Sequence, residues 1–407
     1  MYGLAMSGKL CKLDLVALLK SFGFHETKTP CLFRHATRNI TFCLVVDDFG
    51  IKYDTQEDLE YLVSCLSSKY HVKVHPVGTK YLGFTIDYNR TARTLSMSYP
   101  RYIPDLLARL RPSGIKHYHS PAIYTPPSYG RTGPQLSTQA PFSPPASPAQ
   151  QKELQIIVGS LLYYARAVDA TILPAVCALA CDQAAPTLDT MVAAERLLGY
   201  VAKFPLATIT FFPSDMLLLA HSDASYLSRT NSGSVAGGFH FLGKENDPTF
   251  FNGPIFCVST LIPVIVAAVS EAEYAAVFGN AQYACDERCI LASLGYTQPP
   301  TTILCDNECA VGLANDTIRP KMSKSINMRL HWVQNRVKLN QFRVVFVPGV
   351  DNLADFSLNL CLYIATMSSH HTTSLAPPNP VPATLFSLPY IPHSVSGYMP
   401  NGCVDML

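Results

Sequence analysis

The spacing of apolar residues predicts alternating helices and strands along the first 118 residues. Helical spacing covers residues 10–22 and 56–70, whereas residues 80–88 and 93–99 alternate between apolar and polar positions as strands do. Residues 31–34 read as a further short strand. This order of helices and short strands indicates an α+β arrangement.

Two adjacent carboxylates, Asp47 and Asp48, interrupt the apolar run of residues 41–53. Two short apolar runs separated by a turn predict a β-hairpin with the acids at its tip. Neighbouring strand residues point to opposite faces, so we expect one acid to do chemistry and the other to support it. A solvated Asp-rich turn fits the same residues. The triplet Asp48-Phe49-Gly50 also matches the magnesium motif of protein kinases, but no Gly-rich loop, strand lysine or HRD-type loop precedes it, which argues against that class.

In the second half of the chain, acids follow predicted strands or lie on predicted helices. This alternation of strand acid and helix acid is the order of an RNase H fold, which brings four distant carboxylates to one site. The set consists of Asp223 in strand 216–226, Glu271 or Glu273 on the helix after residue 269, Asp306 after strand 301–305 and Asp355 after strand 342–347.

Four carboxylates at one place suit two divalent ions. Two ions about 3.5 to 4 Å apart can activate a water and stabilise the leaving oxygen of a phosphodiester. Carboxylates are ligands that Mg²⁺ prefers. Helix residues two apart do not share a face, so only one of Glu271 and Glu273 can serve. Read one at a time, each acid also fits a turn, a cap or a solvated helix face.

The composition is that of a globular chain with ample apolar residues for buried cores. Of 407 residues, 48% are hydrophobic and 15% charged, which predicts two or three domains. The 13 cysteines are scattered without CxxC pairs, so we expect reduced, buried thiols rather than a zinc site or disulfides. The apolar stretch 255–269 is too short to span a membrane. We therefore expect a soluble intracellular protein.

The net charge of +2 hides basic segments. Residues 1–118 hold 16 Lys and Arg against 10 Asp and Glu, and seven Lys and Arg but no acid lie between Asp316 and Asp351. Basic stripes of this kind favour a polyanion, although a solvated helix face is the alternative. We expect Trp332 to pack rather than stack on a base. The candidate phosphate contacts are Arg109 and Arg111 on the basic helix 101–111, and Lys321, Lys324, Arg329, Arg336 and Lys338 on or beside the helix 327–340.

Proline-rich segments divide the chain. Residues 119–150 contain eight prolines and predict an extended linker. Helical spacing resumes at 151–165 and 187–202. Residues 361–407, with seven prolines and the pair His370-His371, predict a disordered tail.

Several short motifs in the first half resemble one known family. The order YGL-x3-G from Tyr2, SFGF from Ser21, PCLF from Pro30, LVVDD from Leu44 and KYLGFTI from Lys80 resembles the C-terminal half of the reverse transcriptase palm of copia-type (Ty1/copia) LTR retrotransposons. The resemblance implies that Asp47 and Asp48 are two of three carboxylates that bind two magnesium ions. The family's third carboxylate lies upstream of the YGL segment, and Met6 stands where the family has Gln.

The second half resembles the same polyproteins. VGSLLYYARAVDATI from Val158 is similar to their connection segment, and HSDAS, SEAEY, CDNECAVGLAND and VPGVDNLAD within residues 217–358 are similar to their RNase H. The resemblance implies that Asp223 bridges two ions, Glu273 and Asp306 complete the first, and Asp355 holds the second. Glu273 is preferred because its spacing to Ala276 matches the family's E-x-x-A. Ser325 and Asn327 replace the family's His and Asp.

Together these features predict a Pol polyprotein fragment. The expected fold is a partial reverse transcriptase palm and thumb (1–118), a linker (119–150), connection helices (151–215), an RNase H-like mixed sheet with flanking helices (216–360) and a disordered tail (361–407). The expected activity is hydrolysis of the RNA strand of RNA-DNA hybrids with two Mg²⁺ or Mn²⁺ ions per site. The alternative is a decayed or domesticated remnant that binds nucleic acid without turnover.

The resemblance also carries expectations about polymerase activity and location. We expect the polymerase part to be inactive alone, because it has two carboxylates where three are needed, unless a partner chain supplies the missing half of the reverse transcriptase. No membrane contact is expected. The protein is expected in the cytoplasm, within a virus-like particle, or in the nucleus.

Overall fold

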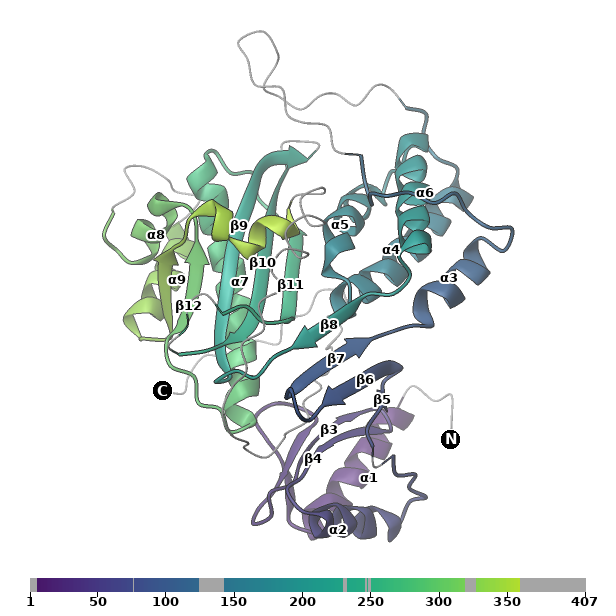
Figure 1. Ribbon diagram of the computed structural model, residues 1–407. Coiled ribbons are helices and arrows are strands. Elements are labelled where there is room, and N and C mark those ends of the chain that lie inside the picture. Colours follow the sequence, from purple (N-terminus) through teal and green to yellow (C-terminus); the bar gives the residue numbers. More distant parts are fainter. Residues whose placement is uncertain are drawn as a thin grey trace.

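The computed structural model describes residues 6–75, 77–123, 143–229, 233–245, 247, 250–318 and 327–358. Three β-sheets with helices packed against them make up this part of the chain (Figure 1). The predicted tail 361–407 lies outside the described residues. None of the helices in the described ranges is long and apolar enough to cross a membrane.

The first sheet is antiparallel and carries the paired acids at one turn. Its order is β1 (Phe24–Glu26), β2 (Leu32–His35), β3 (Thr41–Val45) and β4 (Asp48–Lys52). Helices α1 (Ser7–Ser21) and α2 (Gln56–Ser67) cover it, and Phe24, Phe33 and Phe42 fill the core between them. The predicted hairpin is confirmed, because Val45 of β3 pairs with Asp48 of β4.

The second sheet joins segments that are distant in sequence. Its order is β5 (Lys80–Tyr81), β6 (Phe84–Asn89), β7 (Thr94–Ser98) and β8 (Thr208–Phe211). The prediction of one continuous strand over residues 80–88 is wrong. Leu82 and Gly83 have φ values of 52° and 87°, a backbone turn that separates β5 from β6.

Four helices form the core between the second and third sheets. They are α3 (Tyr102–Leu110), α4 (Pro148–Ala167), α5 (Leu173–Asp182) and α6 (Leu188–Lys203). Helix α4 starts inside the predicted linker 119–150, because Ser147 and Gln150 form a reciprocal capping box and Pro148 occupies the first turn. Helix α5, with a 3-10 turn before it at Ala170–Ile172, has no counterpart among the predicted elements.

The third sheet is mixed, with two parallel strands added to an antiparallel meander. Its order is β11 (Pro254–Leu261), β10 (Gly233–Gly243), β9 (Leu217–Arg229), β12 (Thr301–Cys305) and β13 (Phe342–Phe346). Strands β9 to β11 run antiparallel, whereas β12 is parallel to both β9 and β13. Strand β11 overlaps the apolar stretch 255–269, for which no strand was predicted.

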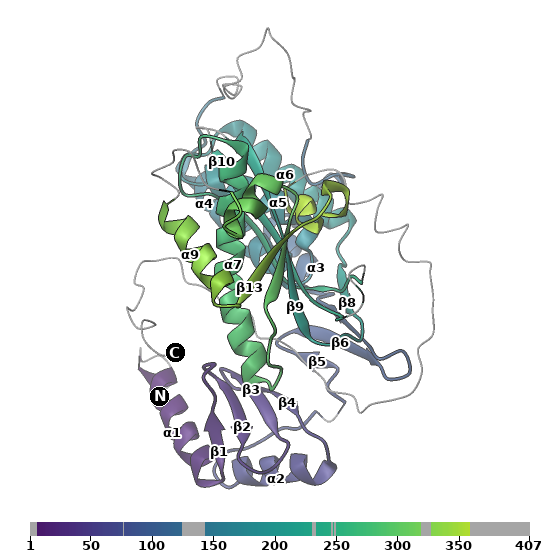
Figure 2. The same cartoon turned by 90° about the vertical axis from the view of Figure 1, so that its left-hand side faces the viewer.

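Helical layers cover both faces of this mixed sheet (Figures 1 and 2). Leu218 and Ala220 of β9 pack with α7 (Val269–Ser293), α8 (Glu308–Ala314) and α9 (Asn327–Lys338). Leu219, on the other face of the same strand, packs with the α4–α6 core. The long crossover helix α7 connects the antiparallel and parallel parts. This is the RNase H-like mixed sheet that the sequence predicted.

Candidate active site

The register of the mixed sheet sets two acids side by side. Asp223 lies within β9, opposite Gly237 of β10. On the other side of β9, Ser222 pairs with Cys305, the last residue of the parallel strand β12. An aspartate follows each of these two paired residues, Asp223 in β9 and Asp306 after β12. Parallel pairing in this register is what brings these two distant positions together.

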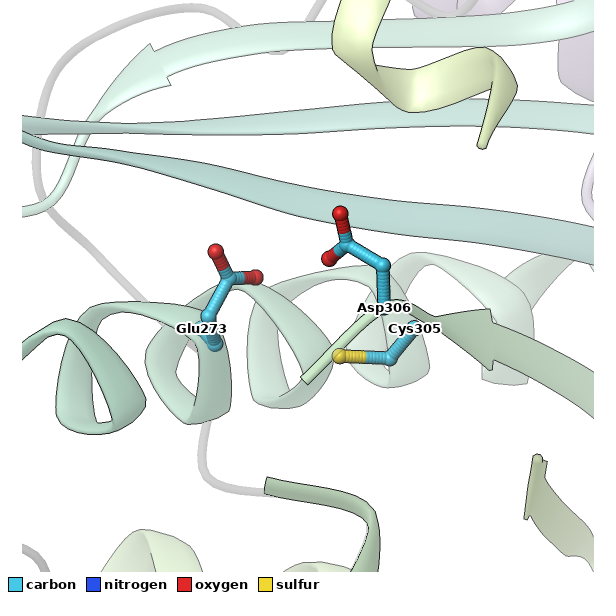
Figure 3. Close-up of side chains that lie close together, drawn as sticks. All are labelled: Glu273, Cys305 and Asp306. Carbon is cyan, nitrogen blue, oxygen red and sulfur yellow. The ribbon is translucent and has the colours of Figure 1, made fainter. Parts of the chain in front are cut away.

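Helix α7 adds a buried glutamate to the pair. Glu273 lies in the first turns of α7 with 5% of its surface exposed. Ligand atoms of Glu273, Cys305 and Asp306 all lie within 4.8 Å of one another, and the two carboxyl groups face each other in Figure 3. Glu271 instead accepts a hydrogen bond from the Ala267 N–H at 2.9 Å, which caps the helix start. The geometry thus separates the two glutamates that the sequence left as alternatives.

The fourth acid, Asp355, comes from a short 3-10 turn, η4 (Leu353–Ser357), after β13. Asn352 ties this turn to β9, because its Nδ2 donates to the Ser222 carbonyl at 3.0 Å. The Leu353 N–H donates to His221 Nδ1 at 3.2 Å. Burial lowers the pKa of His221 to about 4, so the ring is neutral and Nδ1 is free to accept. Asp355 lies close enough to Asp223 to raise its pKa.

Burial and mutual repulsion raise the proton affinity of this cluster. Burial is the largest cause that raises the pKa of Asp223, and the charges of Asp306 and Asp355 add to it. Burial likewise raises the pKa of Glu273, with Asp223 the next cause, and it raises the pKa of Asp306. Like charges gathered in a poorly solvated place keep a proton unless a cation replaces it.

The cluster fits a hard divalent cation by two observations. Its donor set is mainly carboxylate oxygen, which Mg²⁺ and Mn²⁺ prefer. In addition, Glu273 Oε2 is buried and has no hydrogen-bond partner among the described residues. A buried carboxylate oxygen without a partner is costly, and a bound cation would satisfy it.

A buried polar network anchors α7 to the sheet beside this cluster. Asn280 Nδ2 donates to Ser222 Oγ at 2.9 Å, to the Gly237 carbonyl at 2.9 Å and to the Ala276 carbonyl at 3.0 Å. His240 of β10 bridges Asn280 Oδ1 at 3.0 Å and Glu287 Oε2 at 2.8 Å. Both ring nitrogens of His240 face oxygen acceptors, which favours the imidazolium form. The network fixes the position of the helix that carries Glu273.

The hairpin acids lie elsewhere and are exposed. Asp47 is in the turn directly after Val46, whose φ is 58°, and Asp48 begins β4. Among the described residues, the one group of three potential ligands with atoms this close is Glu273, Cys305 and Asp306. The structure therefore does not bring Asp47 and Asp48 to a third carboxylate within the described ranges, and their catalytic and metal roles stay predictions.

Among the predicted phosphate contacts, Arg111 forms two ion pairs within the fold. Its Nη1 contacts Glu153 Oε1 of α4 at 2.6 Å, and its Nη2 contacts Glu195 Oε2 of α6 at 2.7 Å. With both carboxylates on one guanidinium, Arg111 joins three chain segments and has its charge compensated. This geometry gives Arg111 a structural role, and its contact with nucleic acid stays a prediction.

The remaining candidate cations differ in how freely they face solvent. Arg109 is exposed on α3. On α9, Arg329 lies over the Phe278 ring and Arg336 over the Trp332 ring, while Lys338 Nζ contacts Asp316 Oδ2 at 3.0 Å. Trp332 meets Phe278 edge-on, so its expected packing role is confirmed. Lys321 and Lys324 lie outside the described residues.

Several residues of the site were not foreseen. Their roles depend on contacts with distant segments, which local sequence patterns do not reveal. These residues are Cys305, Asn352 and the network of His240, Asn280 and Glu287. Cys305 directly precedes a candidate ligand at a strand end, which is the one hint the sequence offered. Asn352 lies in the motif VPGVDNLAD, which also contains Asp355.

The chain is similar in sequence to transposon polyproteins. No protein-family model matches the chain. The chain is 29% identical over 363 residues to the retrovirus-related Pol polyprotein from transposon RE2 of Arabidopsis thaliana, and 24% identical over 367 residues to that from transposon TNT 1-94 of Nicotiana tabacum. Each match covers 87% of this chain but 23% and 26% of the relative. The chain thus spans about a quarter of the length of these relatives.

Solved RNase H1 structures are also similar to the chain. One is LC11-RNase H1, isolated from compost, with 14% identity, 35% of this chain and 92% of that chain covered, and a TM-score of 0.27. Another is RNase H1 from the halophilic archaeon Halobacterium salinarum, with 15% identity, 34% and 90% covered, and a TM-score of 0.24. From the matches along 87% of its sequence, we identify the chain as a relative of the retrovirus-related Pol polyproteins of copia-type transposons.

Proposed function

We propose that residues 216–358 hydrolyse the RNA strand of an RNA-DNA hybrid with the help of two divalent cations. The observation that carries the proposal is the convergence of Asp223, Glu273, Asp306 and Asp355 from β9, α7, the end of β12 and η4. Four carboxylates from separate elements, with an unpartnered buried oxygen among them, are poorly explained as a stabilising feature, because their mutual repulsion costs free energy.

Each acid has a defined part in this proposal. Asp223 would contact both ions, Glu273 and Asp306 would complete the first set of ligands, and Asp355 would complete the second. When bound, the ions supply a nucleophile at neutral pH and neutralise charge on the phosphodiester. Burial raises the pKa of Asp223 and of Glu273, so a proton held in this cluster would leave when a cation binds.

Substrate contacts are assigned to four cations at the surface, two exposed and two half-buried, and to the sugar. Arg109, Arg329, Arg336 and Lys338 are proposed to contact phosphates, which would make affinity depend on salt. Discrimination between RNA and DNA would rest on contacts to the 2′-hydroxyl. For the hairpin acids Asp47 and Asp48, we propose that polymerase chemistry would need a third carboxylate beside them.

One cleavage assay tests the proposal. The full chain is incubated with an RNA-DNA hybrid labelled on the RNA strand in the presence of Mg²⁺, beside Asp306→Asn and, as a matched control, Asp87→Asn at an exposed position of β6. We expect Asp306→Asn to reduce cleavage by more than about 100-fold, since even groups that only support a metal ligand cost about 10 to 100-fold. Asp87→Asn should cleave like the parent.

The assay also decides between the enzyme and the alternative. Binding of the hybrid without cleavage by the parent chain would favour a remnant that binds nucleic acid without turnover. Equal cleavage by the parent and Asp306→Asn would point to a contaminating nuclease and would reject the proposal.

A further inference from the structure

A thiol lies at the floor of the carboxylate cluster. Cys305 is fully buried, and its Sγ lies within 4.8 Å of carboxylate oxygens of both Glu273 and Asp306. Figure 3 shows the sulfur below the two facing carboxyl groups. The parallel pairing of β12 with β9 holds the Cys305 backbone in place. The sulfur is therefore positioned by the same elements that position the acids.

Beside Cys305, the cluster contains a buried carboxylate oxygen that a bound cation would satisfy. Glu273 is 5% exposed, and its Oε2 has no hydrogen-bond partner among the residues that the structure describes. This observation is independent of the sulfur, and it concerns a group that faces the same space. A ligand that binds here would have to offer positive charge to oxygen and affinity for sulfur.

We propose that Glu273, Cys305 and Asp306 form a three-ligand site for a thiophilic divalent cation such as Zn²⁺ or Cd²⁺. Two oxygens and a sulfur are a donor set that such ions accept, whereas Mg²⁺ takes oxygen ligands. At a tetrahedral angle, Zn–S and Zn–O bonds of about 2.3 and 2.0 Å place sulfur and oxygen about 3.5 Å apart. The ligand atoms lie within 4.8 Å of one another, so the side chains would close by up to about 1.3 Å around the ion.

The chemistry of binding is a replacement of protons by metal. The S–H bond of Cys305 breaks, a sulfur–metal bond forms, and the proton passes to water; no electrons are transferred. Zn²⁺ takes four ligands and Mg²⁺ takes six. A Zn²⁺ ion held by the Cys305 sulfur would occupy the space that Mg²⁺ and its ligands require. The inference deepens the proposed function, on which its kinetic consequence rests: thiophilic ions should inhibit hybrid cleavage by competing with Mg²⁺.

The direct test is optical and does not depend on activity. The reduced full-length chain is titrated with Cd²⁺ and with Co²⁺, and the ultraviolet sulfur-to-metal charge-transfer absorption is recorded for the parent, Cys305→Ser and Cys257→Ser. Cys257, on β11, is a buried cysteine outside the cluster and serves as the matched control. We expect Cys305→Ser to lose one thiolate's share of the absorption and to bind Cd²⁺ at least about tenfold more weakly. Cys257→Ser should match the parent.

A second variant keeps the test decisive if Cys305→Ser fails to fold. Asp306→Asn retains the thiol and removes one oxygen ligand, so it should weaken Cd²⁺ binding at this sulfur while the other thiols respond as in the parent. Identical titrations of the parent and both variants would overturn the inference. A Cd²⁺ signal from Cys305 in a chain that does not cleave the hybrid would uphold the site and reject only the proposed activity.

Discussion

At the scale of single residues, buried polar groups decide the geometry of the candidate site. Asn280 satisfies Ser222 and Gly237 of the sheet at once, and Asn352 does the same for η4. Buried amides stabilise a structure only when their hydrogen bonds are made. The strand opposite must also leave room for them, which explains the glycine at position 238. A Cβ at Gly238 would collide with Asn280 Oδ1.

We predict that Gly238→Ala destabilises the mixed-sheet domain by about 1 to 3 kcal/mol, because it displaces Asn280 from its acceptors. The matched control is Gly279→Ala on α7, where a Cβ meets nothing within 4 Å and alanine is the better helix former by about 1 kcal/mol. The only tryptophan, Trp332, packs against Phe278 of α7, so its fluorescence in urea reports unfolding of this domain. Equal stability of the two variants would contradict the packing argument.

At the scale of elements, helix α7 is the part on which the site depends. It contributes Glu273 near its start and Asn280 and Glu287 further along, and it contacts three strands of the sheet. Burial of His240 by itself would lower its pKa, but the charge of Glu287 and the hydrogen bonds to Glu287 and Asn280 outweigh burial and raise the pKa above 6.5. The imidazolium and the Glu287 carboxylate thus form a buried ion pair between β10 and α7.

The ion pair predicts a stability that depends on pH. Because the folded-state pKa of His240 is raised, its stabilisation is fully present below the unfolded value of 6.5 and is lost as the pH rises through the folded value. Glu287→Gln should therefore lower the free energy of unfolding by about 3 kcal/mol at about pH 6 and by less at about pH 9. Urea unfolding followed by Trp332 fluorescence measures both.

The comparison variant is Glu60→Gln, at an exposed position of α2. It should leave the free energy of unfolding of the Trp332 domain unchanged at both pH values. A cost of Glu287→Gln that grew with rising pH would show that His240 is neutral in the folded protein, and the assignment of an ion pair would then be wrong.

At the scale of the whole molecule, polar contacts join the parts of the chain. Arg111 connects the end of α3 to α4 and α6. Cys177 of α5 donates to the Ser259 carbonyl of β11, which links the α4–α6 core to the edge of the mixed sheet. Thr29 Oγ1 donates to Ser293 Oγ at the end of α7 at 2.9 Å, so the first sheet touches the same helix. The first sheet therefore contacts α7, and the connecting helices contact the edge of the mixed sheet.

The two arginines of the basic helix should respond differently to substitution. Arg111→Gln leaves Glu153 and Glu195 without their partner and should cost about 1 to 2 kcal/mol of unfolding free energy after allowance for solvent screening. Arg109→Gln should leave stability within about 0.5 kcal/mol but should weaken hybrid binding and reduce its salt dependence by about one counterion. Urea unfolding by circular dichroism and fluorescence anisotropy over a salt series measure the two effects.

A different result would support the sequence-based prediction that Arg111 contacts phosphate. If Arg111→Gln weakened hybrid binding at unchanged stability, its guanidinium would have to leave Glu153 and Glu195 when nucleic acid arrives. If Arg109→Gln left the salt dependence unchanged, the phosphate contacts would lie on α9 instead.

Local pattern predicted most elements and the order of the acids, but it missed α5 and β11. The hairpin at Asp47 and Asp48 and the strand that ends at Cys305 follow from apolar periodicity, which acts over a few neighbours. The short motifs also sufficed for the relationship to copia-type Pol polyproteins. Periodicity failed at residues 80–88, where two positive φ values break an apparently regular strand.

Tertiary structure decided which side chains meet. Local spacing alone left Glu271 and Glu273 open, but the packing of α7 on β9 buries Glu273 beside Asp306 and leaves Glu271 as a cap. The fold pairs Arg111 with two glutamates, a structural role that its place in a basic helix did not predict. Cys305 joined the acids only through parallel strand register. The physical reason is the same in each case, because charge compensation, burial and distance between ligands are properties of segments that are far apart along the chain.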